Sequence, residues 1–423
     1  MTPRIDDRTA HSADLSAAAA GGAPASAADA GAGRLARPWR TAITAAAPAW
    51  LAGTLLVLGI GKLASQAKAG RAVLGLNASY LHDHVHELFI WDTSWYLTLA
   101  EHGYRGTPPE AIRFSPLLPL VTRAVAACGI PAAVAILLVC WLAALGFAIL
   151  VHRLALTETG STVTARRAAW LSQLAPGAFV LTMGYTEALA GLLAAAYLLA
   201  VRQYGADRGA RRLWIWCAVG CVAGFGSGLV RPTGFIIAVV GALEILSRLM
   251  RRERMGAAGW TARLAMTLSP ILGVGSFLCW CDAVYGSFLL PYDEQTVHGL
   301  RGTVASNPWA SAWQTFTVPS THGELGGAGM LTLVLVVASV GLLVGCARRL
   351  PLPLSAWAAL SLAAALTAPY FSSFPRYASG DIPLLITAAA LPRSRAAWLW
   401  TAGTSAALCA FFAYRAFTGT YTP

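Results

Sequence analysis

The chain has 423 residues, of which 57% are hydrophobic and only 12% are charged, and its mean hydropathy is +0.58. Soluble domains carry about a quarter charged residues. The apolar residues here form long blocks separated by short arginine-rich breaks, which excludes a soluble globular protein and predicts a polytopic membrane protein. The net charge of +12 does not indicate nucleic acid, because the basic residues are dispersed at the ends of apolar blocks rather than gathered into a stripe.

The N-terminal region differs in composition from the rest. Residues 1–40 are rich in Ala, Gly, Ser and Asp, which predicts a disordered cytoplasmic tail. The apolar block at 41–63 is longer than the core of a secretory signal, so we expect an uncleaved anchor. Ten further apolar blocks lie near 131–156, 168–184, 188–202, 213–230, 232–249, 262–284, 328–347, 353–371, 377–392 and 396–416.

These blocks predict an all-α polytopic fold with about 11 transmembrane helices, some of them short enough to be tilted or re-entrant. They place one transmembrane domain at 41–416, followed by a short outer tail at 417–423. With the N-terminus in the cytoplasm, about two thirds of the 31 basic residues fall on the inner side, as the positive-inside rule requires. We therefore expect a multi-pass plasma-membrane protein whose long loops, about 64–130 and 285–327, are extracytoplasmic.

The first of these loops carries the strongest polar pattern. It contains W-D-T-S-W-Y at 91–96, A-E-H-G-Y at 100–104 and R-F-S-P-L-L-P at 113–119. On a helix Asp92 shares a face with Trp95 and Tyr96, and such aromatic residues favour the membrane interface. A carboxylate between aromatic walls is partly desolvated and gains basicity, which suits a general base. An interfacial helix whose aspartate caps the helix or faces water fits the same pattern.

These residues also carry a resemblance. W-D-x-x-W-Y-L-x-x-A-E-H-G-Y followed by F-S-P-L-L-P resembles the opening signature of the PIG-V-like mannosyltransferases, members of the GT-C class of membrane glycosyltransferases. Three later stretches agree in order, at 175–188, 229–234 and 375–383. The likeness covers about residues 40–395. The chain departs from the family at Phe114-Ser115-Pro116, where Phe-Phe-Pro is more usual, and it has one aspartate where some GT-C relatives have D-x-D.

The resemblance implies a GT-C-like fold and transfer of a hexose, typically mannose, from a polyprenyl-phosphate sugar to a glycan, lipid or protein acceptor on the outer face. It implies that Asp92 is catalytic. Arg231 and Arg376 are candidate partners of the donor phosphate, although both also suit snorkelling to lipid headgroups. Glu187 either orients one of these arginines, binds sugar or lies in a solvated turn. The further candidate substrate-binding residues are Trp91, Trp95, Tyr96, His102, Tyr104 and Tyr377.

No cofactor is expected. His82 and His86 have helical metal-ligand spacing, but no second cluster completes a site and arginine alone can neutralise a monophosphate, so no metal is expected. Two other functions fit the sequence: a lipid-linked sugar transporter or flippase, and a non-catalytic subunit of a glycosyltransferase assembly. Against a transporter, the sequence has no convincing internal repeat and its acidic residues collect in the outer loops.

Overall fold

A computed structural model describes residues 27–69, 87–206, 210–297, 305–317, 326–368, 371 and 373–419, and all regular structure in these ranges is helical. The chain divides into two units, residues 1–40 and 41–423. Helix α1 (Ala27–Ala69) begins inside the segment predicted to be a cytoplasmic tail. Its first residues are rich in alanine, which has the highest intrinsic helix propensity.

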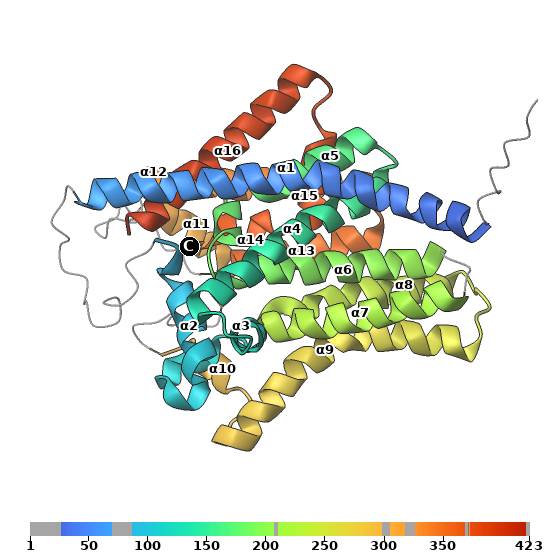
Figure 1. The fold of residues 1–423 in the computed structure, drawn as a ribbon, viewed down its shortest axis with the longest axis horizontal. Coiled ribbons are helices and arrows are strands. Elements are labelled where there is room, and N and C mark those ends of the chain that lie inside the picture. The colour runs from blue at the N-terminus through green and yellow to red at the C-terminus, as the bar shows by residue number, and fades with distance from the viewer. Residues whose placement is uncertain are drawn as a thin grey trace, which may run out of the picture. The chain divides into compact units, whose positions relative to one another are not determined.

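The remaining helices belong to the second unit (Figure 1). In chain order they are η1 (Glu87–Phe89), α2 (Asp92–His102), η2 (Tyr104–Gly106), η3 (Pro109–Arg113), α3 (Leu117–Ala126), α4 (Ala132–Thr159), α5 (Thr162–Leu174), η4 (Ala178–Leu181), α6 (Thr186–Ala206), α7 (Ala210–Val230), η5 (Pro232–Ile237), α8 (Ala238–Met250), α9 (Ala257–Tyr285), α10 (Leu290–Asp293), α11 (Pro308–Thr317), α12 (Gly326–Arg349), α13 (Leu352–Leu366), α14 (Phe374–Ser379), α15 (Ile382–Ala390) and α16 (Arg395–Phe417).

Seven helices of the described residues are long and apolar enough to cross a membrane. They are Trp39–Gln66, Ala132–Thr159, Arg211–Val230, Pro232–Met250, Ala257–Tyr285, Gly329–Arg349 and Arg395–Phe417. Each coincides with one of the eleven predicted apolar blocks. The multi-pass, all-α prediction is therefore confirmed at this level.

The other four blocks do not form long apolar helices, so the count of about 11 is not reproduced. The block at 168–184 is broken because α5 ends before Pro176, which cannot donate a helical hydrogen bond, and a 3-10 turn follows. Helices α13 and α15 have only 15 and 9 residues. Helix α6 carries Glu187 in its first turn and Arg202 near its end. Broken helices are tolerated in a bilayer only where protein covers them or where they line a cavity.

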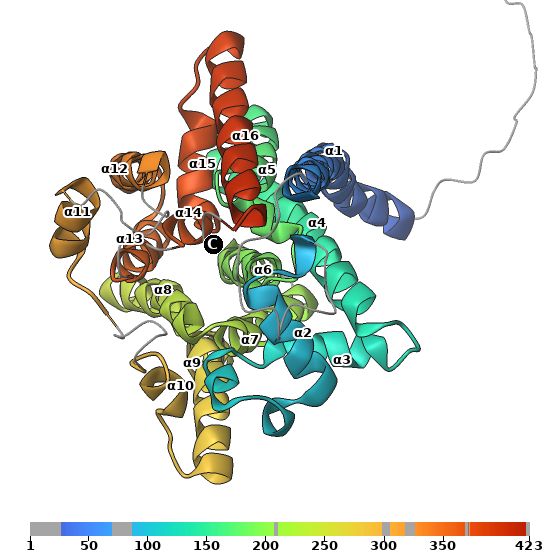
Figure 2. The same cartoon turned by 90° about the vertical axis from the view of Figure 1, so that its left-hand side faces the viewer.

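The helices pack closely around α6. Figure 2 shows α6 in the middle of the second unit, with α7 and α8 on one side and α4 on another, and α6 contacts all three. Small residues allow a close approach between α7 and α9: a Cβ on Gly228 would lie 2.1 Å from the carbonyl oxygen of Pro270. At the N-terminal end of α6, Tyr185, Thr186 and Glu187 are all buried.

Candidate active site

A cavity of about 670 Å³ lies where the first loop region, α6, η5, α13 and α14 meet. Its polar lining consists of Asp92, Tyr96, Arg113, Ser115, Thr186, Glu187, Arg231, Arg376, Tyr377 and Asp381, among others. Apolar side chains continue the wall along α6 and α13, including Ala190, Ala194, Trp357, Ala364 and Ala365. The cavity therefore has one strongly charged region and one apolar region.

Glu187 is the centre of the charged region. Its carboxylate forms ion pairs with Arg231 and with Nε of Arg376, the latter at 2.9 Å. The side chains of Glu187 and Arg376 are 5% and 9% exposed, so this network is largely removed from water. Arg231 also donates from Nε to Thr186 Oγ1 at 3.2 Å. The solvated turn considered for Glu187 is ruled out, because this residue is buried and bridges the two arginines.

Asp92 is the second carboxylate of the network. Nη1 of Arg376 donates to Asp92 Oδ2 at 2.8 Å, and Nη2 of the same guanidinium donates to the Tyr377 hydroxyl at 3.0 Å. Oδ1 of Asp92 has no hydrogen-bond partner among the described residues, and the side chain is 32% exposed in the cavity wall. One carboxylate oxygen is thus fixed by arginine, while the other is able to accept a proton from a bound molecule.

The backbone before Asp92 is held from two sides. Trp91 has φ +60°, a conformation that is costly for a residue with a bulky side chain. Its indole N–H donates to the carbonyl oxygen of Ala416 in α16 at 3.0 Å. The backbone N–H of Asp92 donates to the hydroxyl of Tyr185 at 3.2 Å, and the Tyr185 ring lies 5.2 Å from the Arg376 guanidinium carbon. These contacts fix the carboxylate and its arginine partner together.

A close backbone contact seats the helix that carries Arg376. A Cβ on Gly177 would lie 2.2 Å from the carbonyl oxygen of Pro375, so only glycine fits there. The N–H of Gly177 donates to Oγ of Ser379 at 2.8 Å. The break between α5 and η4 is therefore needed for α14 to approach, and the Ala175-Pro176-Gly177 sequence supplies both the helix stop and the missing side chain.

A further wall of packed aromatic rings lies beside the cavity, and two of the rings, Tyr96 and Phe114, line it. Trp95 and Phe114 stack with their ring centroids 5.6 Å apart, and Tyr96 meets Phe114 edge-on at 5.2 Å. The guanidinium carbon of Arg113 lies 4.9 Å from the Phe114 centroid and 5.9 Å from that of Trp95. This wall joins α2 to the segment that precedes α3.

Burial and charge shift the titration of groups around the cavity. The neighbouring Arg376 guanidinium lowers the pKa of Tyr377 below its usual value. Burial raises the pKa of Asp381 to about 7. Asp381 caps α15 by accepting from the Leu384 N–H at 3.2 Å, but its Oδ2 is buried and makes no hydrogen bond within the described residues. A neutral Asp381 below pH 7 is consistent with that environment.

The structure brings together six of the ten predicted site residues. Asp92, Tyr96, Glu187, Arg231, Arg376 and Tyr377 line the cavity. The other four, Trp91, Trp95, His102 and Tyr104, do not line it: Trp91 is bonded to α16, Trp95 stacks on Phe114, His102 is exposed, and Tyr104 donates to the Phe114 carbonyl oxygen at 2.6 Å. The rings of Trp91, Trp95 and Tyr104 therefore serve packing and positioning.

The sequence alone predicts no role for Tyr185, Arg113 or Asp381. Arg113 and Tyr185 stand inside the quoted motifs, so the signal was present, but their partners are not visible in the sequence. His82 and His86 lie outside the described residues. Within the described ranges no group of three or more His, Cys, Asp or Glu side chains is placed to hold a metal ion.

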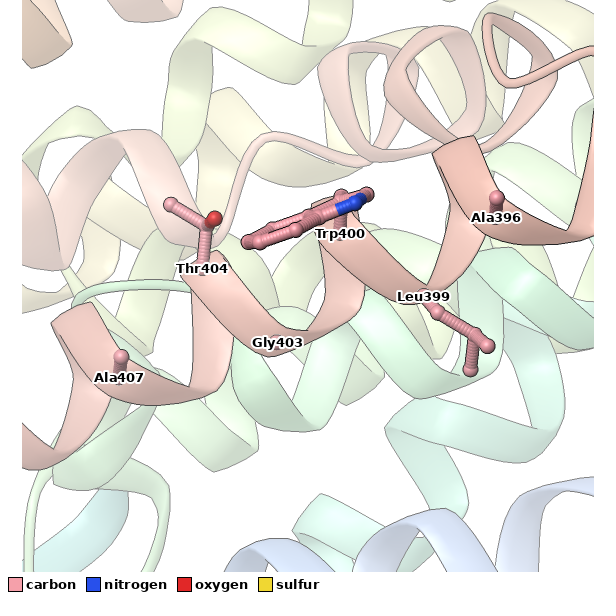
Figure 3. Close-up of a pocket in the computed structure, with 6 residues that line it drawn as sticks. All are labelled: Ala396, Leu399, Trp400, Gly403, Thr404 and Ala407. Carbon is pink, nitrogen blue, oxygen red and sulfur yellow. The ribbon is translucent and has the colours of Figure 1, made fainter.

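A second hollow lies on the outward face of α16. Figure 3 shows its lining along a single helix: Ala396, Leu399, Trp400, Gly403, Thr404 and Ala407. The side chains of Leu399 and Trp400 are exposed, and no charged residue contributes to the lining. Such a surface suits contact with lipid tails rather than chemistry.

Fold and cavity define the class: an all-α, multi-pass membrane protein with a buried arginine–carboxylate network. No protein-family model matches the sequence, and no curated protein matches it. The structure is similar to crystal structures of the oligosaccharyltransferase of Archaeoglobus fulgidus. The apo form gives a TM-score of 0.47 at 13% identity, covering 89% of this chain and 56% of that one. The form tethered to an acceptor peptide containing the NVT sequon gives 0.44 at 14% identity, covering 89% and 55%.

This chain thus spans about half the length of that oligosaccharyltransferase. At these identities and TM-scores the similarity concerns helix arrangement and supports no assignment of activity.

Proposed function

We propose that this protein is a membrane glycosyltransferase that moves a hexose, mannose by the resemblance of its motifs, from a polyprenyl phosphate to an acceptor hydroxyl on the extracytoplasmic face. The observation that carries the proposal is the geometry of Asp92. Arg376 fixes Oδ2, and Oδ1 faces the cavity without a hydrogen-bond partner among the described residues. A positioned carboxylate of this kind is suited to general-base chemistry.

The proposed step is a single displacement. Asp92 accepts the proton of the acceptor hydroxyl, the acceptor oxygen forms a bond to the anomeric carbon of the sugar, and the bond from that carbon to the phosphate oxygen breaks. The leaving polyprenyl phosphate takes the electron pair and gains one negative charge. Arginines fixed before the reaction stabilise this charge without reorganisation. The apolar part of the cavity wall is compatible with a lipid-linked substrate.

The test uses purified protein in nanodiscs with radiolabelled polyprenyl-phosphate mannose and a glycolipid extract of the host membrane as acceptor. We expect acceptor-dependent release of polyprenyl phosphate, reduced by a factor of at least about 100 in Asp92→Asn because the base is lost. Glu101→Gln is the matched control, since Glu101 lies on the same helix and is exposed outside the cavity.

Two other outcomes would favour the alternatives. Movement of the sugar lipid across the bilayer without release of polyprenyl phosphate favours a flippase. Retention of cellular glycosyl transfer by Asp92→Asn at an unchanged protein level favours a non-catalytic subunit. Either result overturns the role proposed for Asp92.

A further inference from the structure

The charges that line the cavity do not all pair with one another. Three arginines face three acids: Arg113, Arg231 and Arg376 against Asp92, Glu187 and Asp381. Asp92 pairs with Arg376, and Glu187 pairs with both Arg376 and Arg231, through the ion pairs described above. Asp381 contacts the N-terminus of α15 rather than any arginine. One cation is therefore left over.

That cation is Arg113. Among the described residues no carboxylate forms an ion pair with Arg113, and its buried Nε makes no hydrogen bond. Its guanidinium instead lies against the stacked rings of Trp95 and Phe114. Aromatic faces hold a guanidinium by its plane and leave the N–H groups at its edge able to donate. A planar fork of this kind matches two phosphate oxygens.

We propose that Arg113 binds the phosphate of the lipid-linked donor, and that it does so as a preformed receptor for a single negative charge. This inference rests on the proposed function and changes the roles of the arginines. Arg376 then orients Asp92, and Arg376 and Arg231 together hold Glu187. The reason is electrostatic. An anion that approached Arg376 would compete with two carboxylates already in place, whereas an anion at Arg113 meets an uncompensated charge.

The charge balance also favours a phosphate with one negative charge over a diphosphate. Arg113 is the one arginine of the described lining without a carboxylate partner, so one anionic charge is enough to pair it. A phosphodiester that links a polyprenol to a sugar has that charge. The leaving phosphate gains a second charge, which Arg113 contacts directly, so Arg113 serves both the bound donor and its departure.

The experiment measures binding without turnover. Purified protein in phosphatidylcholine nanodiscs is titrated with radiolabelled polyprenyl phosphate, with uncharged polyprenol as the matched neutral probe. Losing a charged donor weakens binding by about 10- to 100-fold, and we expect this loss in Arg113→Gln for polyprenyl phosphate but not for polyprenol. Arg105→Gln is the control, because Arg105 is an exposed arginine of the same loop region outside the cavity.

Four outcomes decide the matter. Equal binding of polyprenyl phosphate by wild type and Arg113→Gln overturns the role of Arg113 and leaves the proposed function standing. Displacement by phosphatidylglycerol at equal concentration overturns the assignment to the donor, because the site then accepts any lipid phosphate. Absence of polyprenyl phosphate binding to wild type overturns the proposed function too. If Arg113→Gln does not fold, Arg113→Lys replaces it: weakened binding of the phosphate alone supports the proposal, and unchanged binding overturns it.

Discussion

The buried pairing of Glu187 with two arginines predicts a large loss of stability in Glu187→Gln. The side chains of Glu187, Arg376 and Arg231 are 5%, 9% and 19% exposed, so water screens them poorly. Removing one partner of a buried pair leaves uncompensated charge and costs about 3–5 kcal/mol. Arg376 retains the Asp92 carboxylate, whereas Arg231 retains the Thr186 hydroxyl and the ring of Tyr377 but no carboxylate among the described residues. Most of the loss therefore arises at Arg231.

The assay is unfolding in mixed micelles with rising SDS, followed by circular dichroism. Glu253→Gln is the matched control: Glu253 pairs with Arg248 but is 35% exposed, so a change of about 0–1 kcal/mol is expected. The double variant Glu187→Gln/Arg231→Gln removes both charges and is expected to be more stable than the sum of the single effects by about 0.5–3 kcal/mol. The reasoning is wrong if Glu187→Gln costs no more than Glu253→Gln, or if the two single effects simply add.

Three further predictions concern the surroundings of the network. Gly177→Ala would press a Cβ into the Pro375 backbone, so we expect lower thermal stability and loss of glycosyl transfer. Gly403→Ala is the control, because no atom lies within 4 Å of its new Cβ, and it should leave both unchanged. Equal effects of the two variants would refute the importance of the contact between Gly177 and Pro375. Tyr185→Phe removes the hydroxyl that accepts from the Asp92 N–H, worth about 1 kcal/mol, and should lower the transfer rate about fivefold at unchanged donor KM; a change in KM alone contradicts this positioning role. Burial raises the pKa of Asp381 to about 7, so its contribution to stability is complete below about pH 4 and is lost as the pH rises through 7. The difference in thermal unfolding temperature between wild type and Asp381→Asn should follow that course. A constant difference from pH 4 to 8 would contradict it.

Much of the fold could be predicted because lipid imposes a simple demand on sequence. Long apolar blocks gave the seven candidate spans with nearly the right limits. The early end of α5 and the short length of α15 were harder to predict, because the sequence stays apolar where each helix ends. A hydropathy pattern records how apolar a segment is but not whether neighbouring helices cover an interruption.

Part of the candidate site could be predicted because charged residues stand out in an apolar sequence. Asp92, Glu187, Arg231 and Arg376 stand out as charged residues at the ends of apolar blocks, where charge is costly without a purpose. Their pairing could not be predicted: Asp92 and Arg376 are 284 residues apart in sequence, and nothing local indicates that they touch. Arg113 is not distinctive in the sequence, because an arginine beside aromatic residues at a membrane edge also suits a headgroup contact.

The separation between Asp92 and Arg376 also bears on biosynthesis. The first loop and α6 are synthesised long before α14, so for much of synthesis Asp92 lacks its arginine and Glu187 has only Arg231. The pocket therefore cannot acquire its final electrostatics until one of the last helices arrives. The order of synthesis thus makes the packing of α14 a late step in folding. Until that step, the growing polypeptide holds the Asp92 carboxylate without its arginine partner.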